Sequence, residues 1–134
     1  MVASIVQDVP VTVFATRLSP AEALVKYLKE QGLRLTDIGR VLNRDQRGIW
    51  STYRRASLKH PEVLVLSPAQ ASVPVSLFQD RKLSVLEHVV HHFREKDVQV
   101  KVIASWLGKN PSTIASVHHR ARKKLRSILG NVEN

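Results

Sequence analysis

The side chains best suited to recognition chemistry in this sequence lie in two short segments, each spaced like one face of a helix. In the first segment that face consists of Gln46, Arg47, Trp50, Ser51 and Arg54. Arginine can donate two hydrogen bonds to O6 and N7 of guanine, and glutamine can bridge N6 and N7 of adenine. The first segment therefore predicts direct contacts with base edges in the major groove of double-stranded DNA.

The corresponding face of the second segment is smaller and less polar, and it consists of Pro111, Ser112, Ala115, Ser116 and His119, of which the last four are the predicted base contacts. Basic side chains flank both faces, and such side chains commonly contact phosphates. The predicted phosphate contacts are Arg44, Arg55, Lys59, Lys109, Arg120, Arg122, Lys123 and Lys124. We expect the first segment to do more of the base reading and the second to do more of the anchoring on the DNA backbone.

A repeat in the sequence defines the elements that must position these segments. Residues 18–60 align without a gap on residues 83–125, with twelve identical positions. The match continues upstream, where Val9–Arg17 pairs with Val73–Arg81 and Lys82 is inserted. Two copies of about 65 residues account for nearly the whole chain, so we predict two similar modules.

Each copy predicts three helices after an extended leader. Ser19 with Glu22, and Ser84 with Glu87, match the capping box that begins a helix. Asp45 and Asn110 are favourable N-caps for the third helix of each copy. The predicted modules are residues 1–66, with helices at 19–31, 35–42 and 46–59, and residues 67–134, with helices at 84–96, 100–107 and 111–129. The expected fold is mainly α, with two tandem helix-turn-helix modules and short extended leader segments.

Apolar spacing predicts which helix faces are buried. In the first helices the expected stripes are Ala21, Leu24, Val25 and Leu28, and Leu86, Val89, Val90 and Phe93. In the third helices, the inward residues are expected to be Ile49, Tyr53 and Ala56, and Ile114, His118 and Ala121.

The leaders and the arrangement of the two copies are less strongly determined. Each leader is rich in β-branched residues but contains a proline, which confines it to an edge strand or an extended strap. We expect the leaders to pair with each other or with another chain. The connection between the copies is long enough for both third helices to contact one duplex; alternatively, the copies pack on each other as an internal pseudo-dimer.

The composition agrees with a polyanionic partner. The chain has 134 residues with 21 lysines and arginines against 11 aspartates and glutamates, which gives a formal net charge of +10. Nucleic acid is the commonest partner of so basic a protein. There is no cysteine, which excludes disulfides and thiolate metal sites. Without a membrane-spanning run or a secretory signal, the expected location is cytoplasmic and nucleoid-associated.

Three closely spaced histidines are candidate metal ligands. His88, His91 and His92 are spaced so that their side chains could converge on one helix face. A zinc site needs three or four ligands in fixed geometry, so we favour a solvated or partner-facing surface and expect no metal and no cofactor. The sequence also holds no convergent set of catalytic side chains, so we expect the protein not to be an enzyme.

Two tryptophans and a histidine pair carry further expectations. Trp50 is expected either to contact DNA or to pack against a neighbouring copy or chain, whereas Trp106 is expected to pack in the core or between the modules. Titration of His118 and His119 near neutral pH predicts a DNA affinity that rises on acidification.

The residues of the repeat resemble a known family. The pattern L-S-x-x-E, then I-G/A-x-x-L-N/G, then I-x-S-x-x-x-R-A-x-x-K is similar to the helix-turn-helix of region 4 of bacterial sigma-70 factors and to the DNA-binding domain of LuxR-type regulators. The resemblance covers both copies, about two thirds of the chain, and it implies DNA recognition. The chain departs from the family in lacking the other sigma regions, a receiver domain and the usual serine cap of the second helix.

These observations favour a sequence-specific double-stranded DNA-binding protein that acts as a small transcription regulator. The alternative is a protein-interaction adaptor, in which one repeat docks on RNA polymerase or self-associates through Trp106, the histidine face or the leaders. RNA binding is a weaker alternative, because the sequence lacks the aromatic platforms on which single-stranded bases stack.

Overall fold

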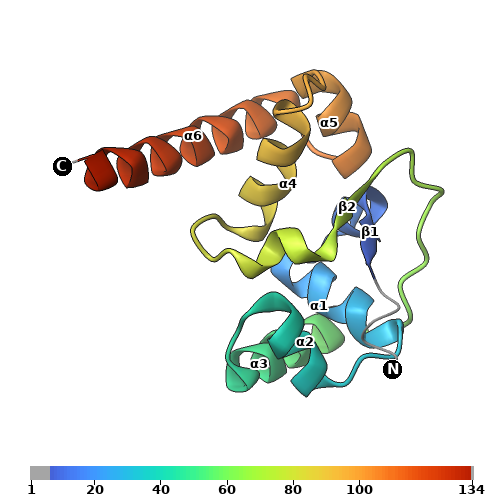
Figure 1. Ribbon diagram of the computed structural model, residues 1–134. Helices are drawn as coiled ribbons and strands as arrows, with labels where there is room; N and C mark the ends of the chain where they lie inside the picture. The colour runs from blue at the N-terminus through green and yellow to red at the C-terminus, as the bar shows by residue number, and fades with distance from the viewer. Residues whose placement is uncertain (1–6, 134) are drawn as a thin grey trace.

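The computed structural model describes residues 7–133, with side chains described up to residue 129. The chain is mainly α-helical, as predicted, and its two halves have the same order of elements (Figure 1). The first half contains β1 (Asp8–Pro10), the 3-10 helix η2 (Val11–Ala15), α1 (Pro20–Glu30), α2 (Leu35–Leu42) and α3 (Gln46–Lys59). The second half contains β2 (Ser72–Pro74), the 3-10 helix η3 (Val75–Gln79), α4 (Val85–Arg94), α5 (Val100–Leu107) and α6 (Pro111–Glu133).

Local sequence signals account for the starts of the helices. Both predicted capping boxes form: Glu22 N donates to Ser19 Oγ at 3.3 Å, and Glu87 N donates to Ser84 Oγ at 3.2 Å. Asn110 Oδ1 accepts from the backbone N–H of Ser112 at 3.0 Å and caps α6. The expectation for α3 was wrong in one detail, because Asp45 occupies the N-cap position but its side chain forms no capping bond.

The two leaders pair with each other, which confirms one of the expected arrangements. Only their first residues are extended, however, because Val11–Ala15 and Val75–Gln79 form 3-10 helices where extended segments were predicted. β1 and β2 form an antiparallel two-stranded sheet in which Val9 lies opposite Val73. Backbone bonds extend the pairing on both sides, from Val11 N to Ala71 O at 3.0 Å and from Val75 N to Gln7 O at 2.8 Å. Because each strand is only three residues long, the sheet alone is a small part of the contact between the halves.

Beyond the sheet, each leader packs on a helix of the other half. η2 packs on α5, and η3 packs on α2. Asn43 Nδ2, just after α2, donates to the carbonyl of Gln79 at 3.1 Å. At the equivalent place after α5, a Cβ atom on Gly108 would lie 3.4 Å from the Cβ of Ala15. The predicted boundary at residue 66 therefore separates two lengths of sequence but not two independent cores, because each leader crosses to complete the opposite module.

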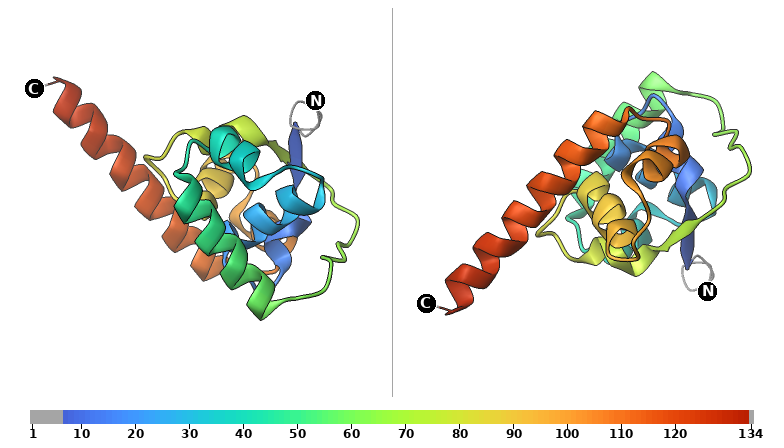
Figure 2. Two further views of the ribbon diagram at one scale, coloured as in Figure 1. Left: turned by 90° about the horizontal axis from the view of Figure 1, so that it is seen from below. Right: turned by 90° about the horizontal axis from the view of Figure 1, so that it is seen from above.

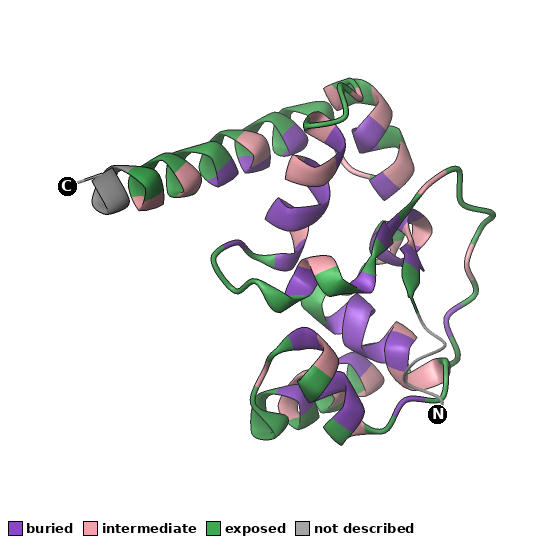
Figure 3. Cartoon of the chain, viewed as in Figure 1, coloured by how far each residue is buried: buried purple, intermediate pink, exposed green. Residues whose placement is uncertain are grey.

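The buried side chains form one continuous cluster that includes residues of both halves (Figure 3). α1 packs on α4, and the rings of Phe14 and Phe78 lie 6.3 Å apart between the halves. The copies are thus packed on each other, as in the pseudo-dimer alternative. α6 extends well beyond this body (Figures 1 and 2).

The structure corrects three expectations about burial. Ala21 is exposed, whereas Ala23 in the same turn of α1 is fully buried. On α6, Val117 and not His118 is fully buried beside Ile114 and Ala121, so the stripe facing the core passes one residue earlier than predicted. His88 is buried, not solvated, and its Nε2 bonds to the backbone carbonyl of Asp80.

Among the described helices, none combines the length and the apolar character that a membrane span requires.

Candidate nucleic-acid interface

α2 and α3 are joined by a tight turn that sets the angle between them. Asn43 adopts the left-handed conformation, with φ 55° and ψ 50°, and Arg44 N donates to Gly39 O at 2.8 Å. A Cβ atom at Gly39 would lie 2.9 Å from the Arg44 carbonyl, so this approach requires glycine. Ile49 anchors α3 on the core, and the opposite face of α3 is therefore turned outward.

The outward face of α3 carries most of the predicted base-contacting side chains together. Gln46, Arg47 and Arg54 are exposed and Ser51 is half-buried. Trp50 is 52% exposed, and the Arg54 guanidinium carbon lies 5.5 Å from the centre of its ring. Both side chains therefore lie on the outer surface of α3. The other half of the chain does not cover the Trp50 ring.

The equivalent face of α6 is exposed but chemically weaker. Ser112, Ala115, Ser116 and His119 are all exposed. The Ser112 hydroxyl donates to Asn110 Oδ1 at 3.0 Å, so its hydrogen is already used at the start of the helix. This arrangement offers little to discriminate one base pair from another.

Four of the predicted phosphate-contacting residues are exposed but form ion pairs with a buried glutamate of their own module. In the first half, Lys59 Nζ lies 3.0 Å and Arg55 Nε 3.5 Å from Glu22 Oε2. The second half repeats the arrangement: Lys124 Nζ lies 2.8 Å from Glu87 Oε1, and Arg120 Nε lies 3.7 Å from Glu87 Oε2. These six residues are identical pairs of the repeat, and the structure explains them as a bridge from the start of the first helix of each half to its third helix.

The carboxylates at the centre of these bridges are ionised at neutral pH. Burial alone raises the pKa of Glu22, but hydrogen bonds from Lys59 and Ser19 outweigh it and hold the pKa below its ordinary value. The pKa of Glu87 is lowered in the same way by Lys124 and Ser84, against the opposing effect of burial. Each bridge therefore keeps its two basic side chains partly neutralised.

Other basic side chains remain available for an anionic partner. Among the described residues, no ion pair is formed by Arg47, Arg54, Lys109, Arg122 or Lys123. All but the half-buried Lys109 are exposed.

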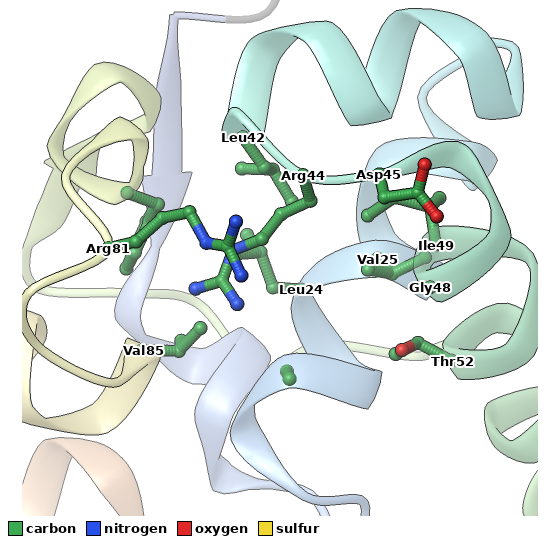
Figure 4. A pocket seen from close by; sticks show the side chains of 12 residues that line it. Leu24, Val25, Leu42, Arg44, Asp45, Gly48, Ile49, Thr52, Arg81 and Val85 are labelled. Carbon is green, nitrogen blue, oxygen red and sulfur yellow. The ribbon is translucent and has the colours of Figure 1, made fainter.

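Arg44 differs from the other predicted phosphate contacts because it is half-buried beside a second arginine (Figure 4). Burial and the nearby charge of Arg81 lower the pKa of the Arg44 guanidinium. Arg81 was not among the predicted phosphate contacts. The signal was present in the repeat, since Arg81 aligns with Arg17, but only the crossing of the leaders places Arg81 next to Arg44.

The histidines do not form a metal centre in the part of the chain that the structure describes, where no group of three or more candidate ligands converges.

Trp106 packs edge-on against Phe93 with ring centres 5.1 Å apart, and its Nε1 donates to Gln70 Oε1 at 2.8 Å. Trp106 therefore serves packing, as expected.

We expect the free energy of unfolding to fall as the pH drops below about 6.5. Burial lowers the pKa of His118, with Arg94 and Arg122 adding to the effect, and burial also lowers the pKa of His92. The unfolded chain has ordinary histidine pKa values near 6.5, so at a pH just below this value it binds more protons than the folded chain does. Thermal unfolding between pH 7.5 and 5.5 measures this dependence.

The variants His92→Gln and His118→Gln provide the comparison for the pH experiment. Each should flatten the dependence of the melting temperature on pH, and the double variant should flatten it most. A wild-type melting temperature that is constant over this range contradicts the prediction. For DNA affinity, the same lowered pKa means that His118 gains its charge only at a lower pH than the sequence suggested.

Comparison with known proteins gives no relative from which a role could be transferred. No family model matches the chain, and neither a curated protein nor a solved structure matches it. Function is therefore inferred from the chemistry of the two helix faces.

Proposed function

We propose that the protein binds double-stranded DNA sequence-specifically and acts as a small transcription regulator, with α3 in the major groove. The observation that carries this proposal is the outward face of α3. Gln46, Arg47 and Arg54 are exposed together on a helix whose other face is anchored in the core. Their side chains match the donor and acceptor patterns of adenine and guanine in the major groove.

The distribution of charge supports the same proposal. The net charge of +10 supplies the sequence-independent attraction to phosphates on which most DNA-binding proteins depend. On α6, the exposed Arg122 and Lys123 lie outside the internal ion pairs. We assign α6 to backbone contacts and α3 to base contacts.

The alternative of a protein-interaction adaptor has less support. Of the surfaces suggested for it, the leaders are paired with each other, Trp106 packs on Phe93, and His88 is buried. These groups are used within the chain.

The proposal predicts DNA binding that weakens steeply with salt. Fluorescence anisotropy with a random-sequence duplex should give a log affinity that falls by about 0.9 for each tenfold increase in salt concentration and each phosphate neutralised. We expect a slope equivalent to several phosphates. Lys123→Ala should reduce the slope by about one phosphate, because its ammonium has no partner among the described residues.

Lys96→Ala is the matched control, since it removes an exposed lysine outside both third helices. It should leave the slope unchanged. Little or no binding at low salt would contradict the proposal, as would an equal loss of slope in the two variants.

A further inference from the structure

A hollow of about 190 Å³ lies where the first half meets the leader of the second (Figure 4). Its apolar walls come from α1, α2 and α3 of the first half and from η3 and α4 of the second half. The apolar lining consists of Leu24, Val25, Leu42, Ile49, Phe78 and Val85. Because most of these side chains belong to the packed core, the walls of the hollow are preformed.

Two arginines give the hollow a positive rim. Arg44 and Arg81 approach from opposite sides, and their guanidinium groups meet over the apolar walls (Figure 4). Among the described residues, neither guanidinium has a carboxylate within 4.0 Å or a hydrogen-bond acceptor. Asp45 also lines the hollow, but its carboxylate lies on the far side from the arginines. Two like charges held together without a counter-ion create a place for an anion.

The second half differs from the first at the positions that open this hollow. Ala21, Gly48 and Thr52 line it, and the equivalent residues of the repeat are the larger or more apolar Leu86, Thr113 and Val117. Val117 is only 1% exposed, so the corresponding volume contains a packed side chain.

The arginine pair is also specific to one half. Arg81 aligns with Arg17, whose guanidinium instead donates to the carbonyl of Lys59 at 3.3 Å. Arg44 aligns with Lys109, which cannot present the planar fork of donors that an arginine offers to a carboxylate. Both the open volume and the pair of arginines are therefore present at this site and have no equivalent at the corresponding position of the other half.

We propose that this hollow binds a small carboxylic acid with an aromatic or branched aliphatic body. The carboxylate would lie between Arg44 and Arg81, each guanidinium donating hydrogen bonds to it, and the apolar body would fill the space above Leu24, Ile49 and Phe78. A cavity of ~150 Å³ holds a molecule of the size of benzene, so the volume suits benzoate or 3-methylbutanoate. A DNA phosphate would engage the arginines but leave the apolar walls uncovered, which favours the small acid. The proposal does not depend on DNA binding.

The test uses the full chain without DNA and follows backbone amide shifts by NMR during titration with benzoate and 3-methylbutanoate. We expect saturable shifts at Gly48 and Thr52, which line the hollow, with a dissociation constant in the millimolar range or tighter. Benzamide, the neutral analogue, and inorganic phosphate, an anion without an apolar body, should each bind at least tenfold more weakly.

Two variants test the two parts of the site. Arg81→Gln removes one exposed guanidinium and should weaken benzoate binding about tenfold or more, because hydrogen bonds to charged groups are the strong ones. Ala21→Leu introduces the leucine that the second half has at the equivalent position, Leu86, and should also weaken binding because the larger side chain fills part of the hollow. Arg17→Gln, the matched control, should leave it unchanged.

The proposal is overturned if neither acid gives saturable shifts, or if phosphate or benzamide binds as tightly as benzoate. It is also overturned if Arg17→Gln weakens binding as much as Arg81→Gln.

Discussion

Replacement of Phe78 by alanine is expected to destabilise both halves of the protein together, by about 4 kcal/mol. Phe78 is 1% exposed and belongs to the leader of the second half, but it lines the hollow together with residues of α1, α2 and α3 of the first half. Its ring also lies 6.3 Å from Phe14 and 6.1 Å from His88. Loss of this ring removes packing on both sides of the contact between the halves.

The two tryptophans allow each half to be followed separately. Trp50 lies in α3 and Trp106 in α5, so Trp50→Phe and Trp106→Phe backgrounds each leave one fluorescent reporter. In both backgrounds Phe78→Ala should lower the melting temperature by about 15 °C, in a single transition at the same temperature.

The control for this experiment is Leu58→Ala, which truncates a side chain that is 72% exposed. It should change the free energy of unfolding by no more than about 0.5 kcal/mol. If Phe78→Ala shifts the Trp106 transition and leaves the Trp50 transition in place, the leader does not join the two modules into one cooperative unit.

Arg47→Ala is expected to reduce the preference for the selected DNA site over unrelated DNA about tenfold to a hundredfold. This prediction follows from the proposed function. Arg47 is exposed near the start of α3, and a bidentate arginine–guanine contact contributes ~1–3 kcal/mol of discrimination. A preferred site is first obtained by selection from random duplexes, and affinities are then measured at one fixed salt concentration.

Ser112→Ala is the matched variant, because Ser112 aligns with Arg47 in the repeat. Its hydroxyl is bonded to Asn110, and we expect the preference for the selected site to change less than twofold. Equal losses of preference in the two variants would show that base reading is shared between α3 and α6. An Arg47→Ala variant that weakens binding to all sequences alike would place this residue on a phosphate instead.

Much of the local structure could be predicted from the sequence, because the signals that start helices act over a few residues. Ser19 and Ser84 with their glutamates begin α1 and α4 as expected. Errors arose where spacing alone assigned burial: Val117 faces the core while His118 lies at its edge. On α6 these two residues are neighbours, and the docking of the helix on α4 decided between them.

The basic residues show a second limit. Their number and helical spacing indicated an anionic partner, and the outward position of Arg47 and Arg54 agrees with that expectation. The sequence could not indicate that Lys59 and Lys124 are bonded to Glu22 and Glu87, since each bond joins residues 37 positions apart. Such pairs form only when the first and third helices pack together.

The sequence by itself determined that the chain forms helices, where most of them begin, and which faces carry the polar and basic side chains. These properties depend on interactions between residues a few positions apart. Only the tertiary structure decided that the leaders cross between the halves, that Phe78 completes the module to which it does not belong in sequence, and that Arg44 meets Arg81 over a hollow. The physical reason is that these contacts join residues distant in the chain, whose proximity results from the burial of apolar surface by the whole molecule.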